Sequence, residues 1–179
     1  MSVTDGGLRA TLVEAALDLL EHGVGDVSLR AVARAAGVSA MAPYRHFPDK
    51  AALLGAVAER GFALLRERLM EADVAEPPRE ALVAQGLAYI AFARSRPALF
   101  RLMFAGPAEA TIDTACKASG YTVLSRRVAG IATHAPEAAA LACWGLVHGL
   151  ATLELDGREM ADTPAHEAAL RILVAGLDQ

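Results

Sequence analysis

The stretch from Val27 to Lys50 constrains the fold of this chain more than any other. Ser28 can act as an N-cap, and apolar residues then recur at helical spacing. These residues are Leu29, Val32, Ala33 and Ala36. Gly37 stands where a helix would end in the left-handed conformation, and Ser39 can cap a second helix two residues later. Because so short a turn makes two helices cross steeply, the stretch predicts a helix-turn-helix unit.

The polar side chains of this stretch are of the types that reach phosphates and base edges of DNA. They are Arg30, Arg34, Tyr44, Arg45, His46 and Lys50. The formal net charge of the 179 residues is −4, which is not typical of a nucleic-acid-binding protein. Residues 26–50, however, contain four basic side chains against two acidic ones, a local charge of +2. The charge pattern therefore favours this stretch, rather than the rest of the chain, as the part that binds DNA.

The remainder of the chain predicts an all-α fold, with no strand-like alternation and no internal repeat. Apolar periodicity and Gly/Pro breaks predict about nine helices. Their approximate ranges are 8–20, 28–36, 39–47, 49–72, 78–95, 97–104, 110–131, 136–156 and 163–177. An interruption near Gly120 is expected within the seventh range. We predict a DNA-binding domain over residues 1–50 and a second helical domain over residues 51–179, with the helix from residue 49 serving both.

The sequence predicts a cytoplasmic protein. No segment has about 18 consecutive apolar residues, as a membrane-spanning helix requires. The first seven residues lack the basic start and apolar run of a signal peptide. The two cysteines, Cys116 and Cys143, fit a reducing compartment, where thiols act as small core residues.

The chain resembles TetR-family transcriptional regulators in two regions. The first runs from about Leu8 to Leu65 and includes Ser28-Leu29-Arg30-x-Val32-Ala33, Gly37-Val38-Ser39, Tyr44-x-His46-Phe47 and Asp49-Lys50-x-x-Leu53-Leu54. The second comprises Arg96–Phe104 and the stretch Trp144-Gly145-Leu146-Val147-His148-Gly149, which is similar to the Trp-His-Gly motif of one C-terminal domain type. Together the two resemblances cover nearly the whole chain.

The resemblance implies which residues contact DNA, because the second helix of a helix-turn-helix enters the major groove. The candidate DNA-binding residues are Ser28, Arg30, Ala40, Met41, Ala42, Tyr44, Arg45, His46 and Lys50. Positions matching Tyr44, His46 and Lys50 contact phosphates in the family. Arg45 can bind guanine in a bidentate manner, or face a phosphate instead. Pro43 predicts a short, distorted second helix, and Phe47 is expected in the core.

The second domain is expected to bind a small hydrophobic effector. Its candidate pocket residues are mostly aromatic. They are Phe62, Tyr89, Phe92, Phe100, Met103, Phe104, Tyr121, Leu124, Trp144 and His148. For each of them singly, a place in an ordinary core is the more frequent role, and His148 is better explained as a hydrogen-bonded core histidine. In the family's mechanism, an effector moves the helix that begins at residue 49 and so releases a repressor from DNA.

We expect a homodimer formed through residues 136–156 and 163–177. The first of these helices has unusually many small residues, which allow another helix to approach closely. They are Ala138, Ala139, Ala140, Ala142, Gly145, Gly149 and Ala151. A symmetric dimer requires a roughly palindromic DNA operator, with half-sites about 34–36 Å apart or a multiple of that distance.

An enzymatic function is not expected, nor is a cofactor or a metal. The glycine pairs Gly6-Gly7 and Gly23-x-Gly25 have no strand before them, so they do not form a phosphate-binding loop. The five histidines have no metal-ligand spacing among themselves. Two alternatives stay open at this point: a redox-sensing regulator that uses Cys116 and Cys143, and a helical small-molecule carrier with no role on DNA.

Overall fold

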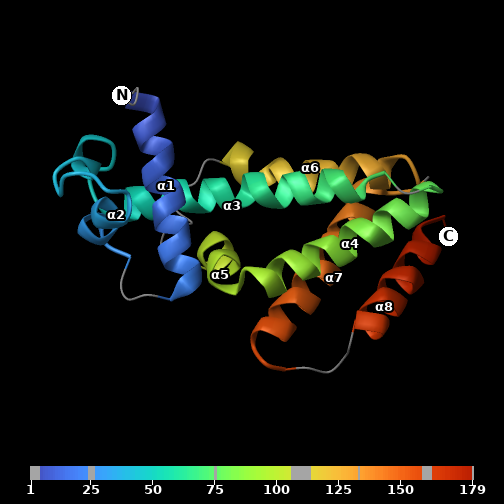
Figure 1. The fold of residues 1–179 in the computed structure, drawn as a ribbon. Coiled ribbons are helices and arrows are strands. Elements are labelled where there is room, and N and C mark those ends of the chain that lie inside the picture. Colours follow the sequence, from blue (N-terminus) through green and yellow to red (C-terminus); the bar gives the residue numbers. More distant parts are fainter. Residues whose placement is uncertain are drawn as a thin grey trace. The chain divides into compact units, whose positions relative to one another are not determined.

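The computed structural model describes residues 5–23, 27–74, 76–105, 114–132, 134–158 and 163–178. Within them the regular elements are all helical (Figure 1). The α-helices are α1 (Asp5–His22), α2 (Leu29–Ala35), α3 (Lys50–Ala72), α4 (Pro78–Ser95), α5 (Pro97–Ala105), α6 (Thr114–Ala129), α7 (Pro136–Leu155) and α8 (Thr163–Ala175). Two short 3-10 helices are η1 (Pro43–Arg45) and η3 (Gly176–Asp178). The predicted all-α fold is confirmed for this part of the chain.

The chain divides into two compact units. The first comprises Met1–Gly61 and Arg96–Cys116, and the second comprises Phe62–Ser95 and Lys117–Gln179. Helix α3 is continuous across the boundary, so its first half belongs to one unit and its second half to the other. The short helix α5 belongs to the first unit although it follows α4 of the second. The functional division into residues 1–50 and 51–179 stays a prediction.

In the first unit α1 packs against both α2 and α5. The fully buried apolar side chains come from all four α-helices of the unit. They include Leu12, Ala16, Val32, Leu53, Leu99 and Met103. Gly61 lets α3 approach α5, since a Cβ there would lie 2.6 Å from Met103 Sδ and 2.9 Å from Leu99 Cδ1. The first unit is therefore a small bundle with a core of its own.

The turn after α2 forms as the sequence predicts. Gly37 has a φ of +68°, the left-handed conformation that costs glycine little. The Val38 N–H donates to the Ala33 carbonyl at 3.0 Å, and the Gly37 N–H donates to the Arg34 carbonyl at 3.2 Å. These two bonds make a Schellman motif, which ends α2 at a defined residue.

The helix predicted over residues 39–47 is replaced by a turn followed by the 3-10 helix η1. The Ala42 N–H donates to the Ser39 carbonyl at 2.9 Å, and the Arg45 and His46 N–H groups donate to the carbonyls three residues earlier. Pro43 lacks an N–H group and cannot donate to the Ser39 carbonyl, as an α-helix would require. The segment up to His46 therefore takes tighter i to i+3 bonds, a stronger departure from an α-helix than the sequence suggests, and the Phe47 N–H then donates to the Pro43 carbonyl four residues earlier at 2.9 Å.

In the second unit α4 packs against α7 and α8, which also pack on each other. The buried residues of α4 lie on one broad face of the helix. Residues of the opposite face, such as Ala84, Ala88 and Ala91, are small and half-buried or exposed. Gly86 permits the close approach, since a Cβ there would lie 2.7 Å from Leu170 Cδ2 and 3.2 Å from Val147 Cγ1. Helix α6 continues through Gly120, so the interruption expected there does not occur, and its predicted start near residue 110 lies outside the described residues.

Replacing Gly86 with alanine is expected to destabilise the protein by about 1–3 kcal/mol, because the added methyl group overpacks a site where Leu170 is 3% exposed and has little room to move. The matched control is Gly120→Ala, also within a helix, where the nearest atom, Leu69 Cδ1, would lie at an ordinary 3.6 Å. That change should be neutral or stabilising by up to about 1 kcal/mol, because alanine favours the helix. Chemical denaturation of both variants measures the difference, and equal effects would contradict the close packing at Gly86.

Ion pairs join elements of the second unit at its surface. The Arg171 guanidinium of α8 donates to both carboxylate oxygens of Glu80 on α4, at 2.7 and 2.9 Å. Hydrogen bonding by Arg171 lowers the pKa of Glu80. Arg127 of α6 donates to the side chain and the carbonyl of Asp73, at 2.6 and 2.9 Å. A bidentate arginine pair fixes the direction of approach as well as adding energy.

Helix α7 is the one described helix that is long and apolar enough to cross a membrane by length and composition. The sequence predicted no membrane-spanning helix, because no stretch of about 18 residues is apolar throughout. Helix α7 meets a different criterion, a mean hydropathy of 1.4. This criterion is weak evidence for one helix, because apolar helices of soluble proteins also meet it. Only 22% of the window is buried within the chain, so much of its apolar surface is open to another partner.

Candidate functional site

The predicted DNA-contacting residues form one exposed set on the first unit. Met41 is 67% and Tyr44 43% exposed, which is unusual for large apolar or aromatic side chains. Arg30, Arg45 and Lys50 are exposed as well, whereas Ala42 and His46 are half-buried. The apolar neighbours in the same stretch face inward. They include Leu29, Val32, Ala33, Pro43 and Phe47. The stretch thus presents its cations and the ring of Tyr44 to solvent from a packed base.

Phe47 anchors the exposed segment to the core of the first unit. Its side chain is 2% exposed, as predicted, and it lies among the largest fully buried residues. The Arg9 guanidinium of α1 lies 5.2 Å from the centroid of its ring, a cation–π arrangement. This anchor follows η1 directly and holds the end of the exposed segment against the bundle.

Both helices that flank the segment have N-terminal caps, of which the one at Ser28 is predicted from the sequence. The Ser28 hydroxyl accepts a hydrogen bond from the Ala31 N–H at 3.2 Å. The Asp49 carboxylate accepts one from the Ala52 N–H at 2.8 Å. Lys50 follows this cap as the first residue of α3. Its positive charge therefore adds to the free N–H groups of a helix N-terminus, which favour binding of a phosphate.

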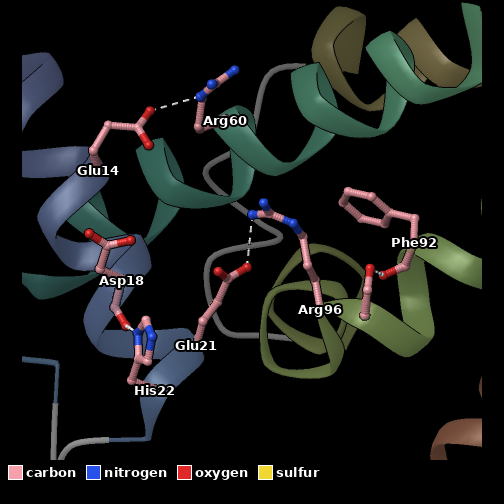
Figure 2. Close-up of polar contacts among 8 residues, drawn as sticks. Glu14, Asp18, Glu21, His22, Arg60, Phe92 and Arg96 are labelled. Atoms are coloured by element: carbon pink, nitrogen blue, oxygen red, sulfur yellow. Dashed lines mark hydrogen bonds and ion pairs between the residues drawn. The ribbon is translucent and has the colours of Figure 1, made fainter. Parts of the chain in front are cut away.

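Two ion pairs hold α1 within the first unit (Figure 2). Arg60 Nε of α3 donates to Glu14 Oε1 at 2.8 Å, and Arg96 Nη1 donates to Glu21 Oε1 at 2.9 Å. Arg60 and Arg96 stand beside 61/62 and 95/96, two of the three positions where the chain passes between the units. The base of the DNA-contacting stretch is therefore tied to both of these crossing points.

The predicted pocket residues are divided between the two units. Phe100, Met103 and Phe104 belong to the first unit, where the rings of Phe100 and Phe104 lie 4.8 Å apart. The other seven belong to the second unit. They are Phe62, Tyr89, Phe92, Tyr121, Leu124, Trp144 and His148. Their common role in one effector pocket stays a prediction.

Four of the seven form a contiguous ring cluster. The hydroxyl of Tyr89 lies 2.8 Å from His148 Nδ1, and Tyr89 is also hydrogen-bonded to the Trp144 side chain. The rings of Trp144 and His148 stack with centroids 5.2 Å apart, and Tyr121 meets Trp144 edge-on at 6.3 Å. We name Tyr89, Tyr121, Trp144 and His148 the ring cluster.

Burial decides the protonation states within the ring cluster. It lowers the pKa of His148 and raises that of Tyr89 above its ordinary value, so both are uncharged near neutral pH. Because the indole N–H of Trp144 is a donor only, Tyr89 accepts from it. The Tyr89 O–H is then left to donate to Nδ1 of the neutral imidazole. His148 is thus a half-buried, hydrogen-bonded histidine, and whether it contacts a ligand stays a prediction.

Gln85 is a buried polar residue that the sequence analysis did not single out. Its side chain is 2% exposed, and neither Oε1 nor Nε2 has a hydrogen-bond partner among the described residues. A buried polar group without a partner costs on the order of 1–3 kcal/mol, so such groups are rare in folded proteins. The available signal was the single amide side chain in the otherwise apolar run from residue 81 to 93. One further buried atom, Glu154 Oε2, lacks a partner, but its carboxylate forms an ion pair with Arg94 at 3.7 Å.

A surface pocket of about 230 Å³ lies elsewhere in the second unit. It is lined by Asp73, Pro78, Arg126, Arg127 and Gly130, none of which is a predicted site residue. Since Arg127 is already bound to Asp73, the charges of this pocket largely satisfy each other.

The thiol and metal chemistry of the described residues is limited. Burial raises the pKa of the Cys143 thiol to about 11, so it stays protonated near neutral pH and reacts slowly with oxidants. The side chain of Cys116 lies outside the described residues. Among the residues described, no group of three His, Cys, Asp or Glu side chains could hold a metal ion.

Comparison with protein families identifies the chain. Residues 12–57 match the model of bacterial regulatory proteins of the tetR family, and residues 82–177 match that of the tetracyclin repressor-like C-terminal domain. The chain belongs to the TetR family. This TetR-family protein is accordingly a DNA-binding transcriptional regulator, and the family is one of regulators rather than enzymes.

Solved structures share the fold of this chain. A protein of unknown function from Rhodococcus sp. RHA1 is 31% identical, with 96% of each chain covered and a TM-score of 0.79. A TetR family transcription regulator from Marinobacter aquaeolei VT8 shares the fold at 18% identity, 96% coverage of each chain and a TM-score of 0.70. FadR from Bacillus subtilis, solved in complex with stearoyl-CoA, shares it at 14% identity, with 95% of this chain and 99% of the other covered and a TM-score of 0.70. Comparison with curated proteins found no match.

Proposed function

We propose that this TetR-family regulator is a cytoplasmic homodimeric repressor that leaves a palindromic operator when a small hydrophobic effector binds its second unit. The observation that carries the proposal is the exposed set at Ser28–Lys50. Arginine, lysine, tyrosine and methionine side chains reach solvent there from a packed base with capped helices on both sides. A rigid base matters because phosphate contacts position a protein on DNA only when their spacing is held.

Residues of this set divide into two roles by chemistry. The DNA backbone is proposed to be contacted by Ser28, Arg30, Tyr44, His46 and Lys50. The side chains for base edges are Ala40, Met41, Ala42 and Arg45. Of these only Arg45 is able to make a bidentate contact to guanine, while the others offer apolar contact such as that to a thymine methyl group. Since one monomer offers so few base contacts, specificity requires a second copy.

Replacing Lys50 with alanine is expected to weaken binding to all DNA sequences alike and to flatten the salt dependence. Loss of one phosphate contact releases about one counterion fewer, so the slope of log K against log salt should fall by about one unit. Fluorescence anisotropy over a series of salt concentrations measures this slope. An unchanged slope would remove Lys50 from the phosphate contacts.

Replacing Arg45 with alanine should instead relax specificity at one base pair, at a cost of about 1–3 kcal/mol for the preferred base. Binding to a panel of single-base operator variants measures this effect, with Lys50→Ala as the matched removal of a nearby cation. If Arg45→Ala lowered the affinity for every variant equally, Arg45 would be a backbone contact.

An exposed apolar stripe on α7 supports the homodimer. Ala138, Leu141, Ala142 and Gly145 recur at i, i+3, i+4 and i+7, and all four are exposed in the single chain. A Cβ at Gly145 would meet no atom within 4 Å, so another helix has room to come close. Leu141 is 59% exposed, and Ile172 of α8, the helix packed beside α7, is 75% exposed. Apolar surface of this kind favours a self-complementary contact between two copies, which in turn requires a palindromic operator.

The ring cluster and its buried neighbours support an effector site in the second unit. Phe62, Phe92 and Leu124 are buried apolar residues of that unit, and the ring cluster adds aromatic faces with polar tips. Such a lining suits a hydrophobic or aromatic compound.

We infer that the effector acts through α3 and the two ion pairs of α1. Helix α3 carries Lys50 at its start and belongs to the second unit at its end, so a shift of its far end is passed along one rigid element. Arg60 and Arg96, beside two of the three crossing points, hold Glu14 and Glu21 of α1. Movement at either crossing would bias the position of α1 and with it the spacing of the two DNA-contacting stretches.

Selection of genomic DNA fragments by the purified chain at physiological salt tests the proposed function. The expected result is enrichment of a two-fold symmetric sequence, protected in footprinting by the wild type. Absence of any specific fragment would refute it and favour the carrier alternative. The redox alternative gains no support from Cys143, whose thiol is buried and protonated.

A further inference from the structure

We propose that Gln85 is the polar contact for the effector, and that the effector carries an uncharged head group with a hydrogen-bond donor and acceptor side by side, such as a primary amide, on an apolar body. The inference rests on the proposed function, which supplies the effector, and it adds the chemical class that this unit recognises.

The Gln85 amide has hydrogen-bonding capacity that no described residue uses. Its oxygen is an acceptor and its nitrogen carries two donors, and both atoms are buried without a partner. The complement of such a side chain is a group that presents a donor beside an acceptor, as a second amide does. A hydrocarbon or a simple ether would leave at least one of the two atoms unpaired.

Helical spacing places Gln85 beside the ring cluster. Gln85, Tyr89 and Phe92 recur at i, i+4 and i+7 and so share one stripe of α4. Tyr89 reaches His148, and Arg94 pairs with Glu154, so α4 and α7 run in the same direction. Gln85, one turn before Tyr89, therefore lies level with Trp144, one turn before His148.

The ring cluster supplies apolar surface rather than the missing hydrogen bonds. The Tyr89 hydroxyl is bonded both to Trp144 and to His148, so the polar tips of these rings are engaged with one another. Their faces remain suited to stacking, as the Trp144–His148 pair shows. In the proposed complex the apolar body of the effector therefore packs against the rings, and its head group binds Gln85.

The charges of the second unit favour an uncharged head group. Its arginines with described side chains are exposed or already bound to other groups. Arg94 pairs with Glu154, Arg127 with Asp73, and Arg171 with Glu80, while Arg79 donates to the Val174 carbonyl. A carboxylate or an ammonium ion brought beside Gln85 would be buried without a counter-charge, which is strongly unfavourable.

The first experiment tests whether Gln85 lacks a partner in the effector-free protein. Gln85→Met keeps an unbranched side chain of similar length, and it should raise the melting temperature by about 2–4 °C. Leu82→Met, at another buried position of α4, controls for the introduction of methionine and should show no rise. A fall in the melting temperature of Gln85→Met would show that the amide is already satisfied and would overturn the proposal.

The second experiment tests the head group with three probes of one carbon skeleton: 4-phenylbutanamide, its N,N-dimethyl amide and 4-phenylbutanoate. Titration calorimetry on the full chain should show the primary amide binding at least about tenfold more tightly than the other two, equivalent to about 1.4 kcal/mol. Gln85→Met should bind the primary and dimethyl amides equally. The proposal would be overturned if the wild type did not bind the primary amide, or if it bound all three probes equally. It would also be overturned if Gln85→Met still preferred the primary amide over the dimethyl amide.

Operator binding by the wild-type chain is measured on the same samples, which separates the two levels of inference. If the wild type binds its operator but shows no preference for the primary amide, the assignment of the head group fails while the proposed repressor stands. If the wild type enriches no specific DNA, the proposed function fails whatever the probes show.

Discussion

Replacing Ile172 with glutamate is expected to make the chain monomeric and to lower operator affinity by at least about 100-fold. Ile172 is 75% exposed on α8, beside the exposed apolar stripe of α7. At the proposed two-fold contact two glutamates would be brought into an apolar surface without a counter-charge, which is strongly unfavourable. A monomer then binds each half-site separately and loses the effective concentration that links them, a factor of about 10²–10⁴.

Sedimentation velocity and operator titration measure the two parts of this prediction. Val74→Glu is the matched control, because Val74 is also an aliphatic residue of the second unit, is 78% exposed and lies outside α7 and α8. It should leave the dimer and operator affinity unchanged. If the dimer persisted in Ile172→Glu, or if Val74→Glu disrupted it equally, the assignment of the contact to α7 and α8 would be wrong.

Replacing Phe47 with alanine is expected to cost about 3–5 kcal/mol and to abolish specific DNA binding. The ring is 2% exposed and is covered by Arg9 of α1, so its removal leaves a cavity directly beneath η1. The exposed segment would lose its anchor, and its phosphate and base contacts would lose their fixed spacing. Because the chain has two units, the loss should concentrate in the first, and hydrogen exchange of α2 amides is the suitable measurement.

Tyr44→Ala provides the contrast, three residues away on the exposed side. Tyr44 is 43% exposed, so its loss should weaken DNA binding without raising exchange in α2. Phe47→Leu, which keeps most of the apolar volume, should fall between the two. Unchanged α2 exchange in Phe47→Ala would show that the anchor is unimportant for the first unit.

Local signals in the sequence predicted the elements that depend on near neighbours along the chain. Gly37 ends α2 in a Schellman motif, and Ser28 and Asp49 cap the helices that follow them. These features arise from the conformational preference of one residue and from hydrogen bonds over three to five positions. Phe47 is also buried in the core, as the sequence predicted.

Pro43 changes the segment after α2 more than the sequence predicted. Pro43 indicated a distorted helix after the turn, and the structure has the 3-10 helix η1 there, followed by one i to i+4 bond from the Phe47 N–H to the Pro43 carbonyl. The missing N–H of Pro43 can be predicted from the sequence. The conformation of the segment also depends on the packing of Phe47 in the core of the first unit. Arg9 of α1, far away in sequence, contributes to that packing.

By itself the sequence determined the order of the α-helices α1 to α8, the Ser28 cap, the Gly37 turn and the resemblance to the TetR family. Only the tertiary structure decided which partners the buried side chains obtain. It joined Tyr89 to Trp144 and His148, left the amide of Gln85 without a partner, and placed α5 with α1 rather than with α4. The physical reason is that a hydrogen-bond partner or a packing neighbour is supplied by elements 50 or more residues away, as in the pair of Tyr89 and His148, 59 positions apart. No periodicity within one helix encodes that pairing.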